Sequence, residues 1–112
     1  MSIYRNLAVL DAANLVVDEI NALIDANPRR LLYVKQLRDS AQSVCANIRE
    51  GFGRGKGRDR NSALRVARGE AEETIGHLRG NYAAKRITRS VFFSLRNRLI
   101  SIVKMIDGLL GE

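Results

Sequence analysis

The chain has 112 residues and a net charge of +7, with 46% hydrophobic and 5% aromatic residues. This length corresponds to one domain, the hydrophobic content is too high for a disordered chain, and no apolar run approaches the roughly 18–20 residues that cross a bilayer. The single cysteine, Cys45, excludes an intramolecular disulfide. Because the N-terminus also shows no signal-peptide pattern, we expect the protein in the reducing cytoplasm.

Two helices are predicted in the first half of the chain. Apolar residues at 4-3-4-3 spacing predict a helix over residues 4–26, and a similar pattern predicts a second helix over residues 30–50. Asn27-Pro28 ends the first helix, because proline cannot continue a helix and restricts the residue before it. The predicted core positions are Val9, Ala13, Val16, Ile20 and Leu23, followed by Val34, Leu37, Ala41, Val44, Cys45 and Ile48.

A glycine-rich segment, Gly51–Gly57, follows the second helix, and we call it the glycine joint. Each glycine costs a helix roughly 1 kcal/mol relative to alanine, so we expect a loop or a frayed helix end here. Gly51 is predicted to be the glycine just past the last helical residue.

Two further helices are predicted over residues 59–84 and 89–110, with Thr88 as the N-cap of the last. Their apolar faces contain Leu64, Ala67, Ala71, Ile75, Leu78 and Tyr82, then Val91 or Phe92, Leu95, Leu99, Ile102, Ile106 and Leu109. Four helices of similar length joined by short connections predict an all-α fold, an up-down antiparallel four-helix bundle formed by residues 1–112 as one domain.

The residues that could carry catalysis or bind a cofactor give no recognisable pattern. The glycine joint is not a phosphate-binding P-loop, because Glu50 and Gly57 stand where that motif needs glycine and Ser or Thr. His77 has no second histidine at metal-ligand spacing, and Cys45 is predicted to be a buried apolar residue. The neighbouring carboxylates Glu70, Glu72 and Glu73 are expected to pair with Arg65, Arg68 or Arg79. We therefore expect neither an enzyme nor a metal or cofactor.

Positive charge is concentrated in the middle of the chain, which favours anionic partners, nucleic acid first. We call the residues that carry it the basic strip: Arg49, Arg54, Lys56, Arg58, Arg60, Arg65 and Arg68. Arginine can bind phosphate oxygens with two parallel hydrogen bonds, and the glycines would let the loop follow a phosphate backbone. Phe52 is the one aromatic residue here, so base stacking has little support. Alternatively, the strip is a solvated charged surface or pairs with acids of another subunit.

Several of these residues resemble a known family. They are Gln36-Leu37-Arg38, Ser40, Ser43, Asn47-Ile48-Arg49-Glu50-Gly51-Phe52-Gly53-Arg54 and Ala67-Arg68-Gly69-Glu70. Together they resemble the bacterial proteins encoded in intervening sequences of 23S ribosomal RNA genes, whose pattern reads like Q-L-R…S…N-I-A-E-G-F-G-R followed by A-R-G-S. Arg49 and Glu70 depart from this pattern.

The resemblance implies a four-helix bundle that assembles as a ring-shaped homopentamer and has no established enzymatic activity. The family is similar to the accessory protein of diversity-generating retroelements, which works with a reverse transcriptase on nucleic acid, so a reverse transcriptase is a possible partner by resemblance. In the family, the residues corresponding to Asn47, Glu50, Gly51, Gly53 and Gly69 form a packing motif. We expect Asn47 and Glu50 to form hydrogen bonds across helices near Arg68.

These observations give two hypotheses. In the first, a non-enzymatic oligomeric bundle binds RNA or DNA electrostatically through the basic strip, with little sequence specificity and no membrane partner. In the second, the protein is a structural interaction module whose arginines serve subunit or partner-protein contacts.

Overall fold

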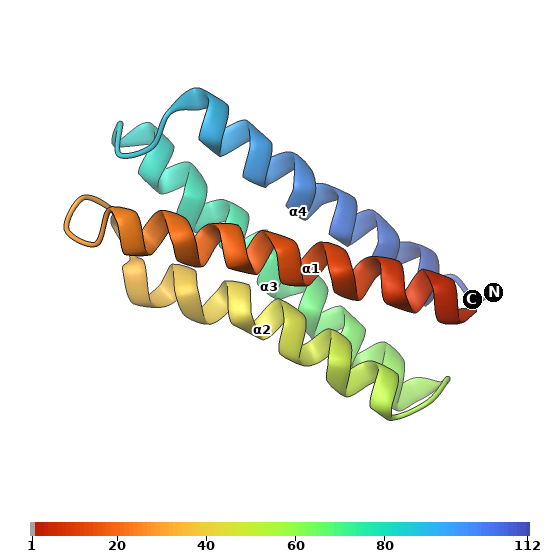
Figure 1. Cartoon of the computed structure of the whole chain (residues 1–112). Helices are drawn as coiled ribbons and strands as arrows, with labels where there is room; N and C mark the ends of the chain where they lie inside the picture. The colour runs from red at the N-terminus through yellow and green to blue at the C-terminus, as the bar shows by residue number, and fades with distance from the viewer. Residues whose placement is uncertain (1) are drawn as a thin grey trace.

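Four α-helices form nearly the whole chain in the computed structural model, which describes residues 2–112 (Figure 1). They are α1 (Ser2–Ala26), α2 (Val34–Gly53), α3 (Arg58–Ala83) and α4 (Arg89–Leu110). Each runs antiparallel to the next, α1 and α3 each pack against both α2 and α4, and the bundle measures 42 × 22 × 18 Å. The predicted up-down antiparallel four-helix bundle is confirmed.

The two ends of the bundle differ in what they contain (Figure 1). The beginning of α1, the end of α4 and the α2–α3 connection lie at one end, which we call the joint end. The α1–α2 and α3–α4 connections lie at the opposite end, which we call the loop end. A ligand that spans both ends would therefore have to follow the length of the bundle.

The core contains the apolar faces predicted from helical spacing. Buried residues include Leu37, Ala41, Val44, Cys45 and Ile48 of α2, Leu64, Ala67, Ala71, Ile75 and Leu78 of α3, and Phe92, Leu95, Leu99, Ile102, Ile106 and Leu109 of α4. In α1 the predicted core residue Leu23 is half-buried, and its neighbour Ile24 is buried in its place. Among residues 2–112, no helix has both the length and the apolar character that crossing a membrane requires.

The second helix begins later than predicted, at Val34 and not near residue 30. Tyr33 adopts a left-handed backbone conformation (φ 58°), which interrupts the helix before Val34. Leu31 turns into the core, where it is buried. The connection between α1 and α2 is thus a folded loop whose shape is set by tertiary contacts.

One buried side chain, that of Asn81 in α3, holds this loop. Its Oδ1 accepts a hydrogen bond from the backbone N–H of Leu32 (2.7 Å), and its Nδ2 donates to the carbonyls of Leu32 (3.0 Å) and His77 (2.9 Å). Asn81 has no exposed surface, so these bonds satisfy a polar group that would otherwise be costly to bury. The α1–α2 connection is therefore fixed against α3.

The second helix also ends later than predicted, because Gly51 and Gly53 are helical and Arg54 is the C-cap. The prediction that Gly51 follows the last helical residue is wrong. A Cβ atom at Gly51 would lie 3.2 Å from the carbonyl oxygen of Arg60 and 3.4 Å from Ala63 Cβ. Gly51 thus serves the close approach of α2 and α3, while the turn itself uses the positive φ angles of Gly55 and Gly57.

The last two helices agree with the prediction to within one residue. α3 covers Arg58–Ala83, and α4 has the predicted bounds, Arg89–Leu110. Thr88 is the N-cap, since its side chain accepts a hydrogen bond from the backbone N–H of Val91 (3.1 Å).

Replacing Asn81 should destabilise the whole bundle. In Asn81→Ala, the backbone N–H and C=O of Leu32 lose their partner, and we expect the free energy of unfolding to fall by about 1–3 kcal/mol in urea denaturation. Asn97→Ala is the matched control, because Asn97 is exposed on α4 and its loss should change stability by no more than about 0.5 kcal/mol. Equal stability of the two variants would contradict the role assigned to Asn81.

Candidate nucleic-acid interface

The structure places the basic strip at and near the joint end. Arg49 lies in the last turns of α2, Arg54 and Lys56 lie in the connection, and the other four residues lie in the first half of α3. A pocket of about 380 Å³ lies beside the end of α2, and its lining includes Arg49, Arg54 and also the acidic Glu50.

Four bases of the strip have carboxylate partners: Arg54, Lys56 and Arg68 at the surface, and Arg60, which is buried. Arg54 Nη2 lies 2.6 Å from Glu50 Oε1 within α2. Arg68 Nη1 lies 2.7 Å from Asp107 Oδ1 of α4, and Lys56 Nζ lies 3.3 Å from Glu112 Oε2. Exposed pairs of this kind stabilise a fold by only about 0–1 kcal/mol, but each offsets a positive charge that a phosphate would otherwise meet.

Arg60 was predicted to be a surface contact, and the structure corrects this. Only 5% of Arg60 is exposed. Its Nη2 donates to the carbonyl of Leu109 (2.8 Å), and its Nη1 lies 3.5 Å from Glu112 Oε2. Because a buried guanidinium needs these internal acceptors, Arg60 serves packing between the start of α3 and the end of α4 and is left out of the interface.

The Glu112 carboxylate interacts with three basic side chains at the joint end. Arg5 Nη1 lies 2.7 Å from its Oε1, while Lys56 and Arg60 approach its Oε2. Burial raises the pKa of Glu112, but hydrogen bonds and charges from these three bases outweigh that effect and hold the pKa below its usual 4.5. Glu112 thereby links the beginning of α1, the glycine joint, α3 and the end of α4.

The remaining bases of the strip are free of carboxylates in the part of the chain that the structure describes. Arg58 and Arg65 are exposed on α3 and form no ion pair there. Arg49 is exposed as well, and its Nη2 donates to Asn14 Oδ1 of α1 (3.3 Å). The positive charge available at the joint end thus comes mainly from Arg49, Arg58 and Arg65.

The expectation that Asn47 and Glu50 form hydrogen bonds across helices is wrong. Asn47 Nδ2 donates to the carbonyl and hydroxyl of Ser43 within α2 (2.8 and 3.0 Å), and Glu50 pairs with Arg54. A side-chain hydrogen bond between α2 and α3 is instead formed by the buried hydroxyls of Thr74 and Ser40, with Thr74 Oγ1 donating to Ser40 Oγ (2.8 Å).

Two other glycines of the family motif are not packing positions within this chain. Gly53 and Gly69 are exposed, and a Cβ atom added to either would meet no atom within 4 Å in the described residues. Of the motif glycines, Gly51 alone is explained by a contact inside the bundle.

The carboxylates of α3 do not form the predicted ion pairs. No pair joins Glu70, Glu72 or Glu73 to an arginine in residues 2–112. Arg68 pairs with Asp107, the guanidinium of Arg79 lies over the ring of Phe92, and Arg65 is exposed. Partial burial, with the nearby Glu73, raises the pKa of Glu70. Glu73 Oε1 lies 3.6 Å from His77 Nε2, and that buried nitrogen has no hydrogen-bond partner within the described region.

The prediction that Cys45 is a buried apolar residue is confirmed. The residue belongs to the core, and burial raises the pKa of its thiol, which disfavours the reactive thiolate. Across residues 2–112, no three His, Cys, Asp or Glu residues gather as metal ligands would.

Comparison with known proteins settles the family. The model of the 23S rRNA-intervening sequence protein family matches residues 5–108. The chain belongs to this family. A crystal structure of a protein of unknown function from the S23 ribosomal protein family of Bacteroides thetaiotaomicron is also similar, with 26% identity, a TM-score of 0.89, and coverage of 96% of this chain and 99% of that one. No curated protein matches the chain.

The residues matched by the model of the 23S rRNA-intervening sequence protein family include the glycine joint. In this member, the turn follows a helix that continues through Gly53, and the motif's buried contact is that of Gly51 with the start of α3.

The Glu112 cluster should make stability depend on pH. A lowered pKa in the folded state means that the stabilisation is present above the usual pKa of 4.5 and is lost as the pH falls through the lower, folded-state value. We expect Glu112→Gln to unfold at a lower temperature than the wild type at pH 7, with the difference vanishing toward pH 3. A difference that stayed constant over this range would contradict the assignment.

Proposed function

We propose that this protein is a non-enzymatic, oligomeric four-helix bundle that binds RNA or DNA through its positive surface, with little sequence specificity. The observation that carries the proposal is the net charge of +7, together with the exposed Arg49, Arg58 and Arg65, which have no carboxylate partner among the described residues. A positive surface of this kind attracts polyanions at long range and binds phosphates without reading bases.

The geometry at the joint end supports phosphate contact by only part of the basic strip. Arg58 and Arg65 extend from one helix without carboxylate partners in the described residues, whereas Arg54 and Lys56 are paired. An arginine already paired with a carboxylate must exchange that partner for a phosphate, so it contributes less to net affinity than a free one.

Nucleic-acid binding should fall steeply with salt. We expect fluorescence anisotropy with labelled RNA and DNA of unrelated sequences to give similar affinities at about 50 mM salt and a linear loss of log K with log salt. The double variant Arg58→Ala/Arg65→Ala should weaken binding to every sequence and reduce the salt slope by about 0.7–0.9 for each lost phosphate contact.

Arg54→Ala/Lys56→Ala is the matched control, since it removes the same formal charge from residues that have carboxylate partners. It should lower the affinity for nucleic acid by less than Arg58→Ala/Arg65→Ala does. Undetectable binding by the wild type at about 50 mM salt, or binding that salt does not change, would refute the proposed function.

The second candidate function is a structural interaction module, and the proposal of a homo-oligomer, a pentamer by resemblance, belongs to it. Four apolar residues of α1 are unusually exposed: Ile3 (64%), Tyr4 (74%), Leu7 (51%) and Leu15 (58%). On α3, Gly69 and Gly76 have open space beside them, which would let another chain approach closely. Large exposed apolar side chains are typical of protein contacts.

The apolar face of α1 gives a test of assembly. If it is a subunit contact, Leu7→Gln/Leu15→Gln should reduce the particle mass in light scattering from that of an oligomer to the 12.5 kDa of one chain. The helix content should not change, because both side chains lie outside the core. A wild type of 12.5 kDa would exclude the oligomer.

A further inference from the structure

The loop end carries a second group of basic residues that the charge distribution along the chain did not single out. We call it the loop-end cluster: Arg29 and Arg30 of the α1–α2 connection, Lys85 and Arg86 of the α3–α4 connection, and Arg89 at the start of α4. None of these residues forms an ion pair with an acidic side chain among residues 2–112. The reason lies in the sequence, since residues 26–38 and 74–106 contain no Asp or Glu.

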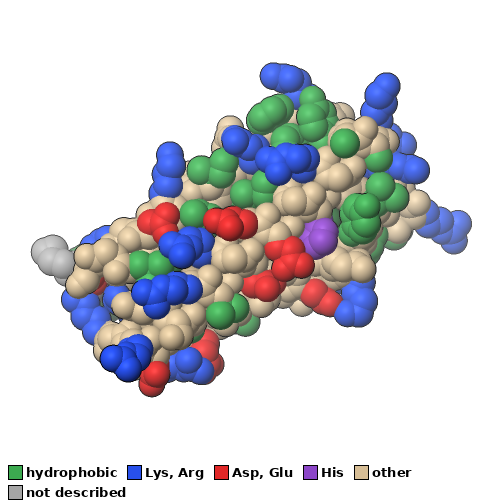
Figure 2. Space-filling model, turned by 180° about the vertical axis from the view of Figure 1, so that it is seen from behind, with side chains coloured by type: hydrophobic (Ala, Val, Ile, Leu, Met, Phe, Trp, Pro, Cys, Tyr) green, Lys and Arg blue, Asp and Glu red, His purple; other side chains and the backbone are tan. Residues whose placement is uncertain are grey.

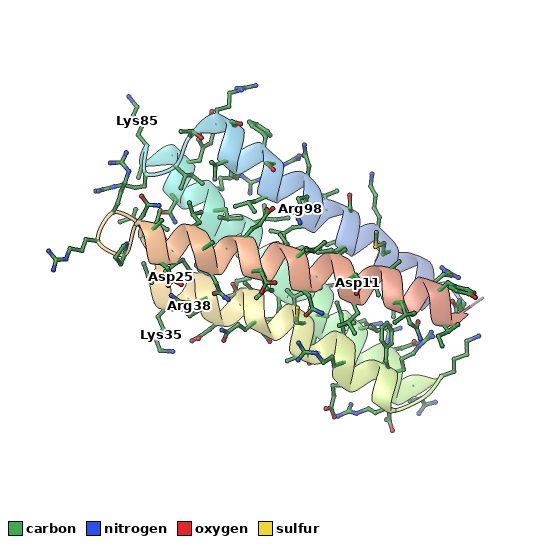
Figure 3. The ribbon with its side chains drawn as sticks, in the orientation of Figure 1. Asp11, Asp25, Lys35, Arg38, Lys85 and Arg98 are labelled. Atoms are coloured by element: carbon green, nitrogen blue, oxygen red, sulfur yellow. The ribbon has the colours of Figure 1, made fainter. Side chains whose placement is uncertain are left out.

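The surface over the α3–α4 connection shows this lack of acids directly. In Figure 2 the upper right of the molecule carries Lys and Arg side chains around hydrophobic ones, while acidic side chains lie toward the middle and the opposite end. In Figure 3 the side chain of Lys85 extends from the connection into solvent, whereas Arg38 lies beside Asp25, with which it pairs at 3.0 Å. The cations of the loop-end cluster thus face solvent without internal neutralisation.

A pocket of about 450 Å³ lies between the two connections. Arg30, Lys85 and Arg86 border it together with Asn27 and Thr88, and apolar side chains such as Val91 complete its wall. Its lining contains no carboxylate, in contrast to the pocket at the joint end, which contains Glu50. A concave site that is bordered by cationic residues and has no carboxylate in its lining suits a phosphate group.

Arg30 fixes the two connections relative to each other. Its Nε donates to the carbonyl of Arg86 (3.0 Å), and its Nη2 donates to the carbonyl of Lys85 (2.9 Å). The position of the Arg30 guanidinium and the backbone spacing of the two connections are therefore set before any ligand arrives, which lowers the entropic cost of binding.

Helix dipoles explain why some cations of the loop-end cluster occur where they do, but not all of them. Arg29 and Arg30 follow the C-terminus of α1, and Lys85 and Arg86 follow that of α3, where cations are favoured. Arg89, however, is the first residue of α4, where a helix disfavours positive charge. Lys85 has φ 59°, a conformation that glycine adopts most easily.

The arginine at the start of α4 is also held in place. The guanidinium of Arg89 lies 4.9 Å from the ring centre of Phe93, and that of Arg96 lies 5.9 Å from the same ring. An arginine resting on an aromatic ring keeps N–H groups free for bidentate contact with phosphate oxygens.

From these observations we propose that the loop-end cluster is the principal phosphate-contacting surface of this protein, with the pocket between the two connections receiving a backbone phosphate of the nucleic acid. This inference rests on the proposed function and names the surface that performs it. The free cations at the joint end then form a secondary contact at the opposite end of a 42 Å bundle.

The test uses a variant that the fold should tolerate, because relief of the backbone strain at Lys85 and of the unfavourable charge at the start of α4 offsets the lost contact of Arg89 with Phe93. Lys85→Gly relieves the left-handed conformation, and Arg89→Gln removes a cation from a helix N-terminus. In the double variant we expect an equal or higher melting temperature together with an affinity for labelled RNA that is about tenfold lower or more at ~50 mM salt. A merely structural role for these residues predicts a lower melting temperature.

Arg58→Gln/Arg65→Gln at the joint end is the matched control, because it removes the same charge from unpaired residues. We expect it to lower the affinity for labelled RNA by less than the loop-end variant does. If the wild type binds and the loop-end variant binds equally well, or binds better than the joint-end variant, the inference is wrong and the proposed function stands. A loop-end variant with a lowered melting temperature would also overturn it. Absence of wild-type binding at ~50 mM salt would refute the proposed function itself.

Discussion

The hydrogen bonds between the buried amide of Asn81 and the backbone of Leu32 determine how the two halves of the bundle meet at the loop end. They close the α1–α2 connection onto α3 and let Leu31 enter the core. Once this connection is fixed, Arg30 can reach the carbonyls that follow α3. The arrangement of charge at this end thus depends on one neutral side chain that no solvent reaches.

The two ends of the bundle use similar residues for different purposes. At the joint end, Glu112 and Asp107 engage Arg5, Lys56, Arg60 and Arg68, so that much of the positive charge holds helices together. At the loop end, backbone carbonyls take the place of carboxylates as acceptors for Arg30 and leave its charge uncancelled. Net charge alone does not separate these two cases, because it counts cations without regard to their partners.

The sequence predicted the features that depend on local periodicity. The seam of α4 and its cap at Thr88 follow from side chains within a few turns of each other, and both are present. The start of α2 could not be predicted, because Asn81, which holds the loop before it, lies 49 residues from Leu32. Gly51 was misplaced because local propensity opposes a helical glycine, whereas the approach of α3 requires one. Likewise, the partners of Lys56, Arg60 and Arg68 lie in the last turn of α4 and beyond it, far from these residues in sequence. Glu50, the partner of Arg54, is the exception, since it lies only four residues away.

The Arg5–Glu112 pair has a consequence for how the molecule can be held. It brings the beginning of α1 and the residue after α4 to the same end of the bundle (Figure 1). Anything joined to the polypeptide before Arg5 or after Glu112, such as a fusion domain, a bead or a sensor surface, would emerge beside the glycine joint. A molecule tethered in this way would be attached through its joint end, and the loop end with Lys85 would point away from the attachment point.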